Sequence, residues 1–373
     1  MRQNKSSNKI RYAVVGLGHI TQVAVLPAFK GTRNSELAAI VSGDSDKRKK
    51  LGRKYGLDQV YSYDEYEHAL AAVNAVYIAV PNHLHHEYTM RALKAGVNVL
   101  CEKPMAVTEE ECEEMIEAAR DNRVKLMIAY RLHFEAGNLE AIRIAKSGRL
   151  GELRIFHSDF AQNVAPDNVR LTEPVEEGGG SVYDMGVYCI NAARYLLQDE
   201  PSQVLAVSAQ SNDPRFRKAG EMTSVVMRFP QNRIATFTCS FGAADISRYA
   251  LIGTKGTLTA DPAYEYASGI KYQLMIKGKS KTKNFPKRDQ SAAEISYFSD
   301  CVLKDKKPEP SGLEGLADVQ IVRAILESAR TGKPVELSRM PQKQKPVPTQ
   351  EIRKSPHGKP ETVKVKSPSG EAA

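Results

Sequence analysis

The N-terminal third of the chain alternates short apolar segments with amphipathic ones, and this alternation limits what the chain can fold into. Apolar runs that end at glycine or proline and are separated by helical patterns are typical of parallel strands joined by crossover helices. We therefore expect residues 1–130 to form an α/β domain with a doubly wound parallel sheet, covered by helices on both faces. The expected strands are 9–16, 35–42, 74–80, 97–103 and 124–130, and the expected helices are 44–55, 64–72, 84–95 and 108–121.

The pattern changes past residue 150, where longer apolar segments follow one another at hairpin-like spacing with few helical patterns between them. This spacing predicts a second, α+β domain at residues 131–336 with a mostly antiparallel sheet. A helical pattern over 313–331 is expected to complete it. Residues 337–373 are rich in proline and charge and poor in large apolar side chains, which predicts a disordered basic tail.

The net charge of +9 invites a nucleic-acid interpretation, but the charge is confined to the two ends of the chain. Residues 1–11 carry +4, and residues 339–373 carry eight Lys or Arg and three Glu, or +5, so that 4 + 5 gives the whole +9. No basic stripe interleaved with aromatic residues is present, so we expect no nucleic-acid partner. No apolar run has membrane-spanning length, and we expect no membrane partner.

The N-terminal sequence and the cysteines bear on localisation. The first apolar stretch runs into a glycine turn and does not resemble the core of a signal peptide. The five cysteines are an odd number with no paired spacing, which is typical of reduced thiols and not of a disulfide or zinc framework. These features predict a cytoplasmic protein.

The segment "VVGLGHIT" follows the first expected strand and opens a helix. Gly16 permits a tight turn, and Gly18 lets a pyrophosphate approach the backbone at the helix N-terminus. The third position of the dinucleotide fingerprint is Thr21 instead of Gly or Ala, yet the strand–turn–helix context favours dinucleotide binding. We expect Gly16, Gly18, His19 and Ile20 to contact the cofactor.

The end of the second expected strand, "AAIVSGDSDKRKK", bears on the choice between NADP and NAD. An acid here usually binds the free ribose of NAD, whereas a small hydroxyl followed by cations suits a 2′-phosphate. Ser42 and Lys47 therefore favour NADP. NAD remains the alternative, because Asp44 is either a ribose acid displaced by two positions or a helix cap.

The segment "YIAVPNHLHHEY" holds three histidines, His83, His85 and His86. Near neighbours do not point the same way from a helix, and no distant acid or cysteine completes a ligand set, so we expect no metal. The segment ends a strand, where open α/β sheets bind ligands. Pro81, Asn82 and His86 are therefore expected to line the cofactor site.

Two further segments carry candidate catalytic residues. "CEKPMAV" places Glu102 and Lys103 at the carboxyl end of an apolar strand, where the ammonium can stabilise developing negative charge. "EEGGGSVYDMGVY" places Asp184 and Tyr188 four positions apart, which puts them on one face of a helix.

In order and spacing, "GLGHI", "AVPNHLHHEYTMRALKAGVNVLCEKPMA" and "GGGSVYDMGVYCINAARYLL" resemble the Gfo/Idh/MocA oxidoreductase family. The resemblance covers residues 10 to 336. It is strongest to the glucose–fructose oxidoreductase branch, on "IVSGDSDK", "LMIAYRLHFE" and "DVQIVRAILESARTGKPVEL". The resemblance implies a Rossmann domain followed by a large open-faced sheet, a tightly held nicotinamide cofactor and a sugar or polyol substrate. It further leads us to expect a homodimer or homotetramer formed through the second-domain sheet.

Carried over by resemblance, Lys103 is the catalytic lysine, Asp184 the accompanying acid and Tyr188 the proton-transfer residue. Most of the family has histidine where this chain has Tyr188, but the glucose–fructose oxidoreductase branch has tyrosine. We expect Glu102 and Lys103 to contact the cofactor too, and Arg131 to contact the cofactor amide region or a sugar hydroxyl.

The resemblance also interprets the three glycines before Asp184, which we expect to leave room for a sugar. The branch is typically exported and carries an N-terminal arm over the cofactor, and neither feature is evident in this sequence. Two alternatives to an NADP-dependent sugar oxidoreductase remain open: an NAD-dependent sugar or polyol dehydrogenase, and a catalytically silent nucleotide-binding sensor subunit.

Overall fold

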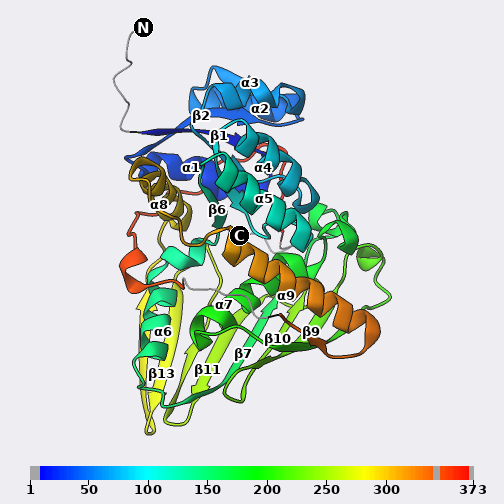
Figure 1. The fold of residues 1–373 in the computed structure, drawn as a ribbon, viewed down its shortest axis with the longest axis vertical. Helices are drawn as coiled ribbons and strands as arrows, with labels where there is room; N and C mark the ends of the chain where they lie inside the picture. The colour runs from blue at the N-terminus through cyan, green and yellow to red at the C-terminus, as the bar shows by residue number, and fades with distance from the viewer. Residues whose placement is uncertain (1–8, 339–344, 369–373) are drawn as a thin grey trace.

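A computed structural model describes residues 9–338 and 345–368 of the chain. Two sheets organise it, and helices cover both faces of the first sheet and one face of the second (Figure 1). The first, sheet A, lies in the N-terminal part and is parallel. The second, sheet B, is larger and mostly antiparallel. The predicted fold class is therefore confirmed.

Sheet A has the strand order β3-β2-β1-β4-β5-β6. The order reverses between β1 and β4, and this reversal is where doubly wound sheets bind dinucleotides. All five predicted strands are present, and a short strand that the sequence analysis missed, β3, extends one edge. The strands are β1 Ile10–Val15, β2 Ser35–Val41, β3 Gln59–Tyr61, β4 Ala75–Ile78, β5 Asn98–Glu102 and β6 Leu126–Ala129.

Two helices of this part, α2 and α5, begin after residues whose side chains bind free backbone amides. Asp44 caps α2, and Thr108 with Glu111 forms the capping box of α5. The helical segments are η1 Thr21–Val25, α1 Leu26–Ala28, η2 Phe29–Gly31, α2 Ser45–Tyr55, η3 Tyr63–Glu65, α3 Tyr66–Ala71, η4 Asn82–Leu84, α4 His85–Lys94 and α5 Glu109–Asp121.

Sheet B has the order β14-β13-β12-β11-β7-β10-β9-β8-β15, and β7 pairs with β10 in parallel. Its strands are β7 Leu153–Ala161, β8 Gln203–Ala209, β9 Met222–Phe229, β10 Arg233–Ser240, β11 Ile246–Gly253, β12 Gly256–Ala260, β13 Ile270–Ile276, β14 Lys279–Phe285 and β15 Val335–Glu336. The other helical segments are η5 Arg131–Phe134, α6 Ala136–Lys146, η6 Val169–Leu171, η7 Val175–Glu177, η8 Val182–Gly186, α7 Val187–Leu197, η9 Pro214–Phe216, α8 Gln290–Leu303, α9 Gly312–Thr331 and η10 Pro348–Gln350.

The two faces of sheet B differ. Helices α6, α7 and α9 lie across one face, and the side chains that point toward them are buried (Figure 1). The strands alternate buried and exposed residues, which is the pattern of a sheet covered on one side. Large apolar side chains remain exposed on the strands: Ile155, Leu205, Val207, Val226, Ile234 and Met275.

Helix α8 comes from the second half of the chain but packs against sheet A. The hydroxyl groups of Tyr12 on β1 and Ser299 on α8 lie 2.8 Å apart and are buried. The Rossmann core therefore includes a helix far beyond residue 130. No helix within the described ranges is both long and apolar enough to cross a bilayer.

The disorder predicted for residues 337–373 is not what the structure has for residues 345–368. Gln350 is buried and donates to the carbonyl oxygen of Glu309 at 3.1 Å. Ile352 and Val363 pack against the core of sheet A. The prediction was wrong because these scattered apolar residues find tertiary partners that the composition of the segment does not indicate. The rest of the predicted tail, at 339–344 and 369–373, lies outside the described residues.

We predict that a chain ending at Ser338 melts at a lower temperature than the full chain. Removing two partly buried apolar side chains should lower the melting temperature by about 2–6 °C. Differential scanning calorimetry measures the effect, and Ile352→Asp in the full chain should reproduce part of it. Equal melting temperatures for all three proteins would show that the segment contributes nothing to stability.

Candidate active site

Lys103 and Asp184 form the contact at the centre of the site. Lys103 follows β5, and its ammonium donates to the Asp184 side-chain Oδ1 at 3.1 Å and to the Asp184 carbonyl oxygen at 2.8 Å. Both side chains are largely buried. Burial opposes the charged form, but Tyr188, Asp184 and Glu102 raise the pKa of Lys103 overall. The lysine is therefore held as a cation.

Arg170 binds the other oxygen of the same carboxylate. Its Nε lies 3.1 Å from Asp184 Oδ2. Burial acts to raise the pKa of Asp184, but the charges of Arg170 and Lys103 lower it overall. Asp184 is therefore ionised and fixed between two cations from different elements.

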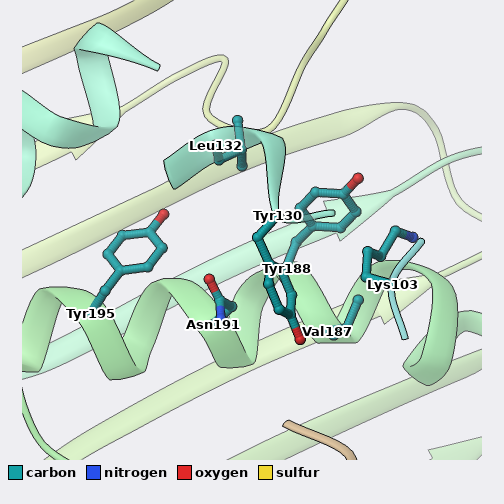
Figure 2. A pocket seen from close by; sticks show the side chains of 7 residues that line it. All are labelled: Lys103, Tyr130, Leu132, Val187, Tyr188, Asn191 and Tyr195. Carbon is teal, nitrogen blue, oxygen red and sulfur yellow. The ribbon is translucent and has the colours of Figure 1, made fainter. Parts of the chain in front are cut away.

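Tyr188 stands beside this ion pair. Figure 2 shows its ring rising from α7 next to the Lys103 side chain. The Lys103 ammonium lies 4.7 Å from the ring centroid, and the Arg131 guanidinium carbon lies 5.2 Å from it. The rings of Phe160 and Tyr264 pack around the tyrosine at centroid distances of 5.6 and 6.0 Å. Two cations and two aromatic rings thus fix its orientation.

Arg131 is held in place by the second part of the chain. Its guanidinium donates to the Tyr264 carbonyl at 2.6 Å and to the Glu265 carbonyl at 3.3 Å. Nearby, the hydroxyl of Tyr77 donates to Glu102 at 2.7 Å, and burial raises the pKa of Glu102. Glu102 and Arg131 therefore lie at the edge where the strands of sheet A end, as predicted.

A buried ion-pair cluster anchors α7, the helix that carries Tyr188. Arg194 contacts Glu314 and Asp318 on α9 at 2.9 and 2.5 Å, and Glu200 at 2.5 Å. Asn191 donates to Glu314 at 2.8 Å. An internal pocket about the size of one water molecule separates Tyr188 from this cluster (Figure 2).

The turn before Asp184 explains the three glycines, and it differs from the expectation that they make room for a sugar. Gly178 and Gly180 have φ angles of +83° and +91°, which side chains rarely adopt. A Cβ on Gly179 would overlap the carbonyl oxygen of Glu173. The glycines therefore let protein backbone approach protein backbone. They lead into the π-helical turn η8, a type of turn that is frequent at functional sites.

The residues predicted to bind the cofactor phosphates fit a dinucleotide. Gly16 has φ +92°, and a Cβ there would overlap the Ala79 carbonyl oxygen. A Cβ on Gly18 would meet nothing within 4 Å, so this side of the turn is open to a ligand. The hydroxyl of Thr21 is buried without a hydrogen-bond partner among the described residues. Ile20 immediately precedes η1. Burial and the charge of Arg170 lower the pKa of His19.

At the end of β2, Ser42 is buried, and its carbonyl oxygen accepts from Arg48. Asp44 is a helix cap: its Oδ1 accepts from the backbone amides of Asp46 and Lys47 at 2.9 and 3.0 Å. The backbone amide of Lys47 is the first of several causes that lower the pKa of Asp44. Of the two interpretations of Asp44, the structure therefore supports the cap.

The side chains of His85 and His86 bind different partners and do not form a common site. His86 was expected to line the cofactor site, and in the structure its Nε2 lies 2.8 Å from Glu114 on α5. His85 is buried between the Pro104 and Val80 carbonyl oxygens, at 2.7 and 3.0 Å, and burial lowers its pKa to about 4.

Pro81 and Asn82 follow β4 at the carboxyl edge of sheet A. Asn82 donates to the Gly178 carbonyl oxygen at 2.7 Å, which ties this edge to the glycine turn. Within residues 9–338 and 345–368, no three His, Cys, Asp or Glu side chains gather as a metal site.

Comparison with known proteins agrees with this geometry. Residues 10–130 match the family model of an oxidoreductase family with an NAD-binding Rossmann fold, and residues 138–259 match the Gfo/Idh/MocA C-terminal domain. The chain belongs to the Gfo/Idh/MocA oxidoreductase family. Its relatives are named dehydrogenases and reductases, and the chain is an NAD(P)-dependent oxidoreductase.

Among the similar sequences is D-xylose 1-dehydrogenase [NADP(+)] of Haloarcula marismortui, which is 30% identical over 343 residues, or 90% of this chain and 95% of that protein. Among the solved structures, the aldose-aldose oxidoreductase from Caulobacter crescentus complexed with glycerol is 36% identical with a TM-score of 0.84. It is matched over 88% of this chain and 100% of its own. KijD10, a 3-ketoreductase from Actinomadura kijaniata in complex with NADP, is 26% identical with a TM-score of 0.79, over 86% and 98% of the two chains.

Sequence reasoning missed Arg170 and placed no weight on Arg48. Arg170 lies in the short helical segment η6, which the sequence pattern does not predict, and only the tertiary fold brings it to Asp184. Arg48 is one of four successive cations on α2, and the sequence does not show which of them turns toward Ser42.

We predict that Gly179→Ala damages the site and that the neighbouring Gly220→Ala does not. The new methyl at Gly179 must displace the Glu173 carbonyl, and overpacking of this kind costs about 1–3 kcal/mol. A Cβ on Gly220 would meet its nearest neighbour, a Val175 methyl, at 3.5 Å, an ordinary contact. Thermal melts and turnover of both variants test this, and equal behaviour would show that the turn tolerates a side chain.

Proposed function

We propose that this chain is an NADP-dependent oxidoreductase that transfers a hydride between the nicotinamide and a sugar or polyol, in the manner of a glucose–fructose oxidoreductase. One observation carries the proposal: Lys103, Asp184 and Tyr188 converge at the carboxyl edge of sheet A. The printed names of the xylose dehydrogenase and of the aldose-aldose oxidoreductase support a sugar substrate.

Tyr188 is the proposed proton-transfer residue. Oxidation of an alcohol releases a proton from oxygen as a hydride leaves carbon, and the nicotinamide, when bound, accepts that hydride. The Tyr188 oxygen takes the hydroxyl proton in this direction and returns it to the carbonyl oxygen in the reverse direction. The cations of Lys103 and Arg131 stabilise negative charge on the phenolic oxygen.

Asp184 has an orienting role in this scheme. Its carboxylate holds the Lys103 ammonium from one side and the Arg170 guanidinium from the other. The Lys103 ammonium donates two of its three protons to Asp184. In this scheme the third proton is donated to a substrate oxygen. The acid therefore positions the lysine and does not compete with Tyr188 for the proton.

Four observations support NADP as the cofactor. Asp44 is engaged as a helix cap, Ser42 offers a hydroxyl, and Lys47 and Arg48 lie in the first turn of the basic helix α2. The cofactor in the names of D-xylose 1-dehydrogenase [NADP(+)] and of the KijD10 complex is also NADP.

The alternatives are weaker. An NAD-dependent dehydrogenase would use Asp44 for the ribose, but this carboxylate caps α2. A silent sensor subunit has no need for the cations around Tyr188, because nucleotide binding does not require them. Purifying the protein, releasing any nucleotide and identifying it by mass spectrometry separates NADP from NAD.

We predict that Tyr188→Phe and Lys103→Met abolish most turnover. The tyrosine variant keeps the packing of the ring and loses only the proton path, an effect of about 10²–10⁴ in kcat. The lysine variant loses the charge that stabilises the oxyanion, an effect of about 10²–10³. Cofactor affinity should survive in Tyr188→Phe, because the turn at Gly16 and Gly18 is untouched.

The matched control is Tyr195→Phe, a buried tyrosine two helical turns along α7 whose hydroxyl donates to Asn138. It should turn over sugar at close to the native rate. Native turnover by Tyr188→Phe would show that the phenol only packs, and a water held by Lys103 would then be the proton acceptor.

The open face of sheet B supports a homodimer or homotetramer. Val207 and Val226, on neighbouring strands β8 and β9, are 67% and 43% exposed, which is unusual for apolar side chains on a face that stays in water. A second copy of the sheet would cover them. This part of the proposal is independent of the catalytic residues.

We predict that Val207→Glu combined with Val226→Glu dissociates the assembly to a monomer. Light scattering after gel filtration measures the mass of each variant. Leu303→Lys, an exposed apolar residue at the end of α8, is the control and should leave the mass unchanged. A native protein that is already monomeric would contradict the assignment of this face.

A further inference from the structure

Residues 361–368, here called the C-terminal strap, cross from the nucleotide side of sheet A to the second part of the chain. The Glu361 carbonyl oxygen accepts from Lys54 Nζ near the end of α2, at 2.6 Å. At the other end, the Pro368 carbonyl oxygen accepts from the Ala165 amide at 3.1 Å. The strap therefore connects helix α2, beside sheet A, to the segment that follows strand β7 of sheet B.

The middle of the strap is fixed to the helical segment η1, which follows the turn at Gly16 and Gly18. Gln22 is 1% exposed, and its side-chain amide binds Val363 twice: Oε1 accepts from the backbone amide at 2.7 Å, and Nε2 donates to the carbonyl oxygen at 3.0 Å. The Gln22 backbone amide in turn donates to Gly18 at 3.2 Å. The strap is thus tied directly to the turn that fits the cofactor pyrophosphate.

Lys364 follows Val363 and reaches the start of α2. Its ammonium lies 2.6 Å from Asp46 Oδ2 and 3.5 Å from Asp44 Oδ2. These two acids stand just past Ser42, where a ribose 2′-phosphate lies in Rossmann folds. Without a partner, both carboxylates would repel a phosphate, and Lys364 is the cation that compensates them.

The last residues of the strap reach the substrate side. Lys366 pairs with Asp167, and Asn168 donates to the Ser367 carbonyl oxygen at 3.4 Å. These partners stand immediately before Arg170, which binds Asp184. The strap residues therefore contact segments at both ends of the carboxyl edge of sheet A, the edge along which Rossmann folds bind a dinucleotide.

We propose that the C-terminal strap completes the cofactor site: Lys364 binds the 2′-phosphate of NADP, and the strap slows release of the bound dinucleotide. The lysine contact deepens the proposed function and rests on its choice of NADP. Neither family model extends past residue 259, so the strap is a feature of this chain outside the matched domains. Lys364 is a specificity-determining residue in this account, not a catalytic one.

The first test compares binding constants for NADP⁺ and NAD⁺ in the full chain, Lys364→Gln and Lys366→Gln by isothermal titration calorimetry. Loss of one charged hydrogen bond to a phosphate should weaken NADP⁺ binding by about tenfold or more in Lys364→Gln, and NAD⁺ binding by less than about twofold. Lys366→Gln is the matched control, an exposed lysine of the same strap that pairs with Asp167, and should leave the ratio of the two constants unchanged.

The outcomes separate the two proposals. A native protein that prefers NAD⁺ contradicts the proposed cofactor, whatever the variants do. A native preference for NADP⁺ that survives unaltered in Lys364→Gln overturns the role of Lys364 and leaves the proposed function intact. Lys364 is exposed, so the substitution does not threaten folding.

The second test measures release of NADPH and NADH from a chain ending at Thr362, by displacement with excess oxidised nucleotide. Nicotinamide fluorescence reports the release, because the emission of the reduced nucleotide differs between the bound and the free state. Loss of the strap should speed release of both nucleotides by about tenfold or more. Unchanged or slower release would overturn the covering role. If the shortened chain does not fold, double substitution of Lys54→Ala and Lys366→Ala in the full chain removes side-chain contacts at both ends of the strap, leaves the turn at Gly16 and Gly18 untouched, and decides the same question.

Discussion

The contact between Lys103 and Asp184 is the interaction on which the site depends. It joins the end of β5 to the turn η8 across 81 residues of sequence, and so joins the Rossmann part to the part that carries Tyr188. Both groups are largely buried, and a buried charge without its partner is strongly destabilising. The same contact that holds the two parts together therefore sets the distance between the lysine and the phenol.

The surroundings of this contact are rigid for separate reasons. The glycine turn fixes the start of η8 because only glycine fits its φ angles and close backbone contacts. The cluster of Arg194 with Glu314 and Asp318 fixes α7 to α9, and Arg170 fixes the second oxygen of Asp184. Each support comes from a different segment, so the orientation of Tyr188 does not rest on any one loop.

The sequence predicted what depends on local pattern and missed what depends on tertiary contact. The strands of sheet A, the helix expected over 108–121 and the strand-end position of Lys103 follow from short-range periodicity and turn chemistry, and the structure confirms them. Arg170 and the order of residues 345–368 could not be predicted, because their partners lie far away in sequence. His86 was expected at the cofactor, but Glu114 on the next helix binds it instead. The roles assigned to Tyr188 and Ser42 remain predictions.

The central claim is that Tyr188 and Lys103 support hydride transfer between a sugar and the nicotinamide. The most direct measurement supplies the enzyme and NADP⁺ with aldoses, such as xylose or glucose, that carry deuterium at C1, and analyses the nucleotide by mass spectrometry. The account predicts NADPH that has gained one deuterium from the sugar, formed more slowly than from unlabelled sugar. Nucleotide that stays oxidised, or is reduced without deuterium, with every aldose tried would contradict it.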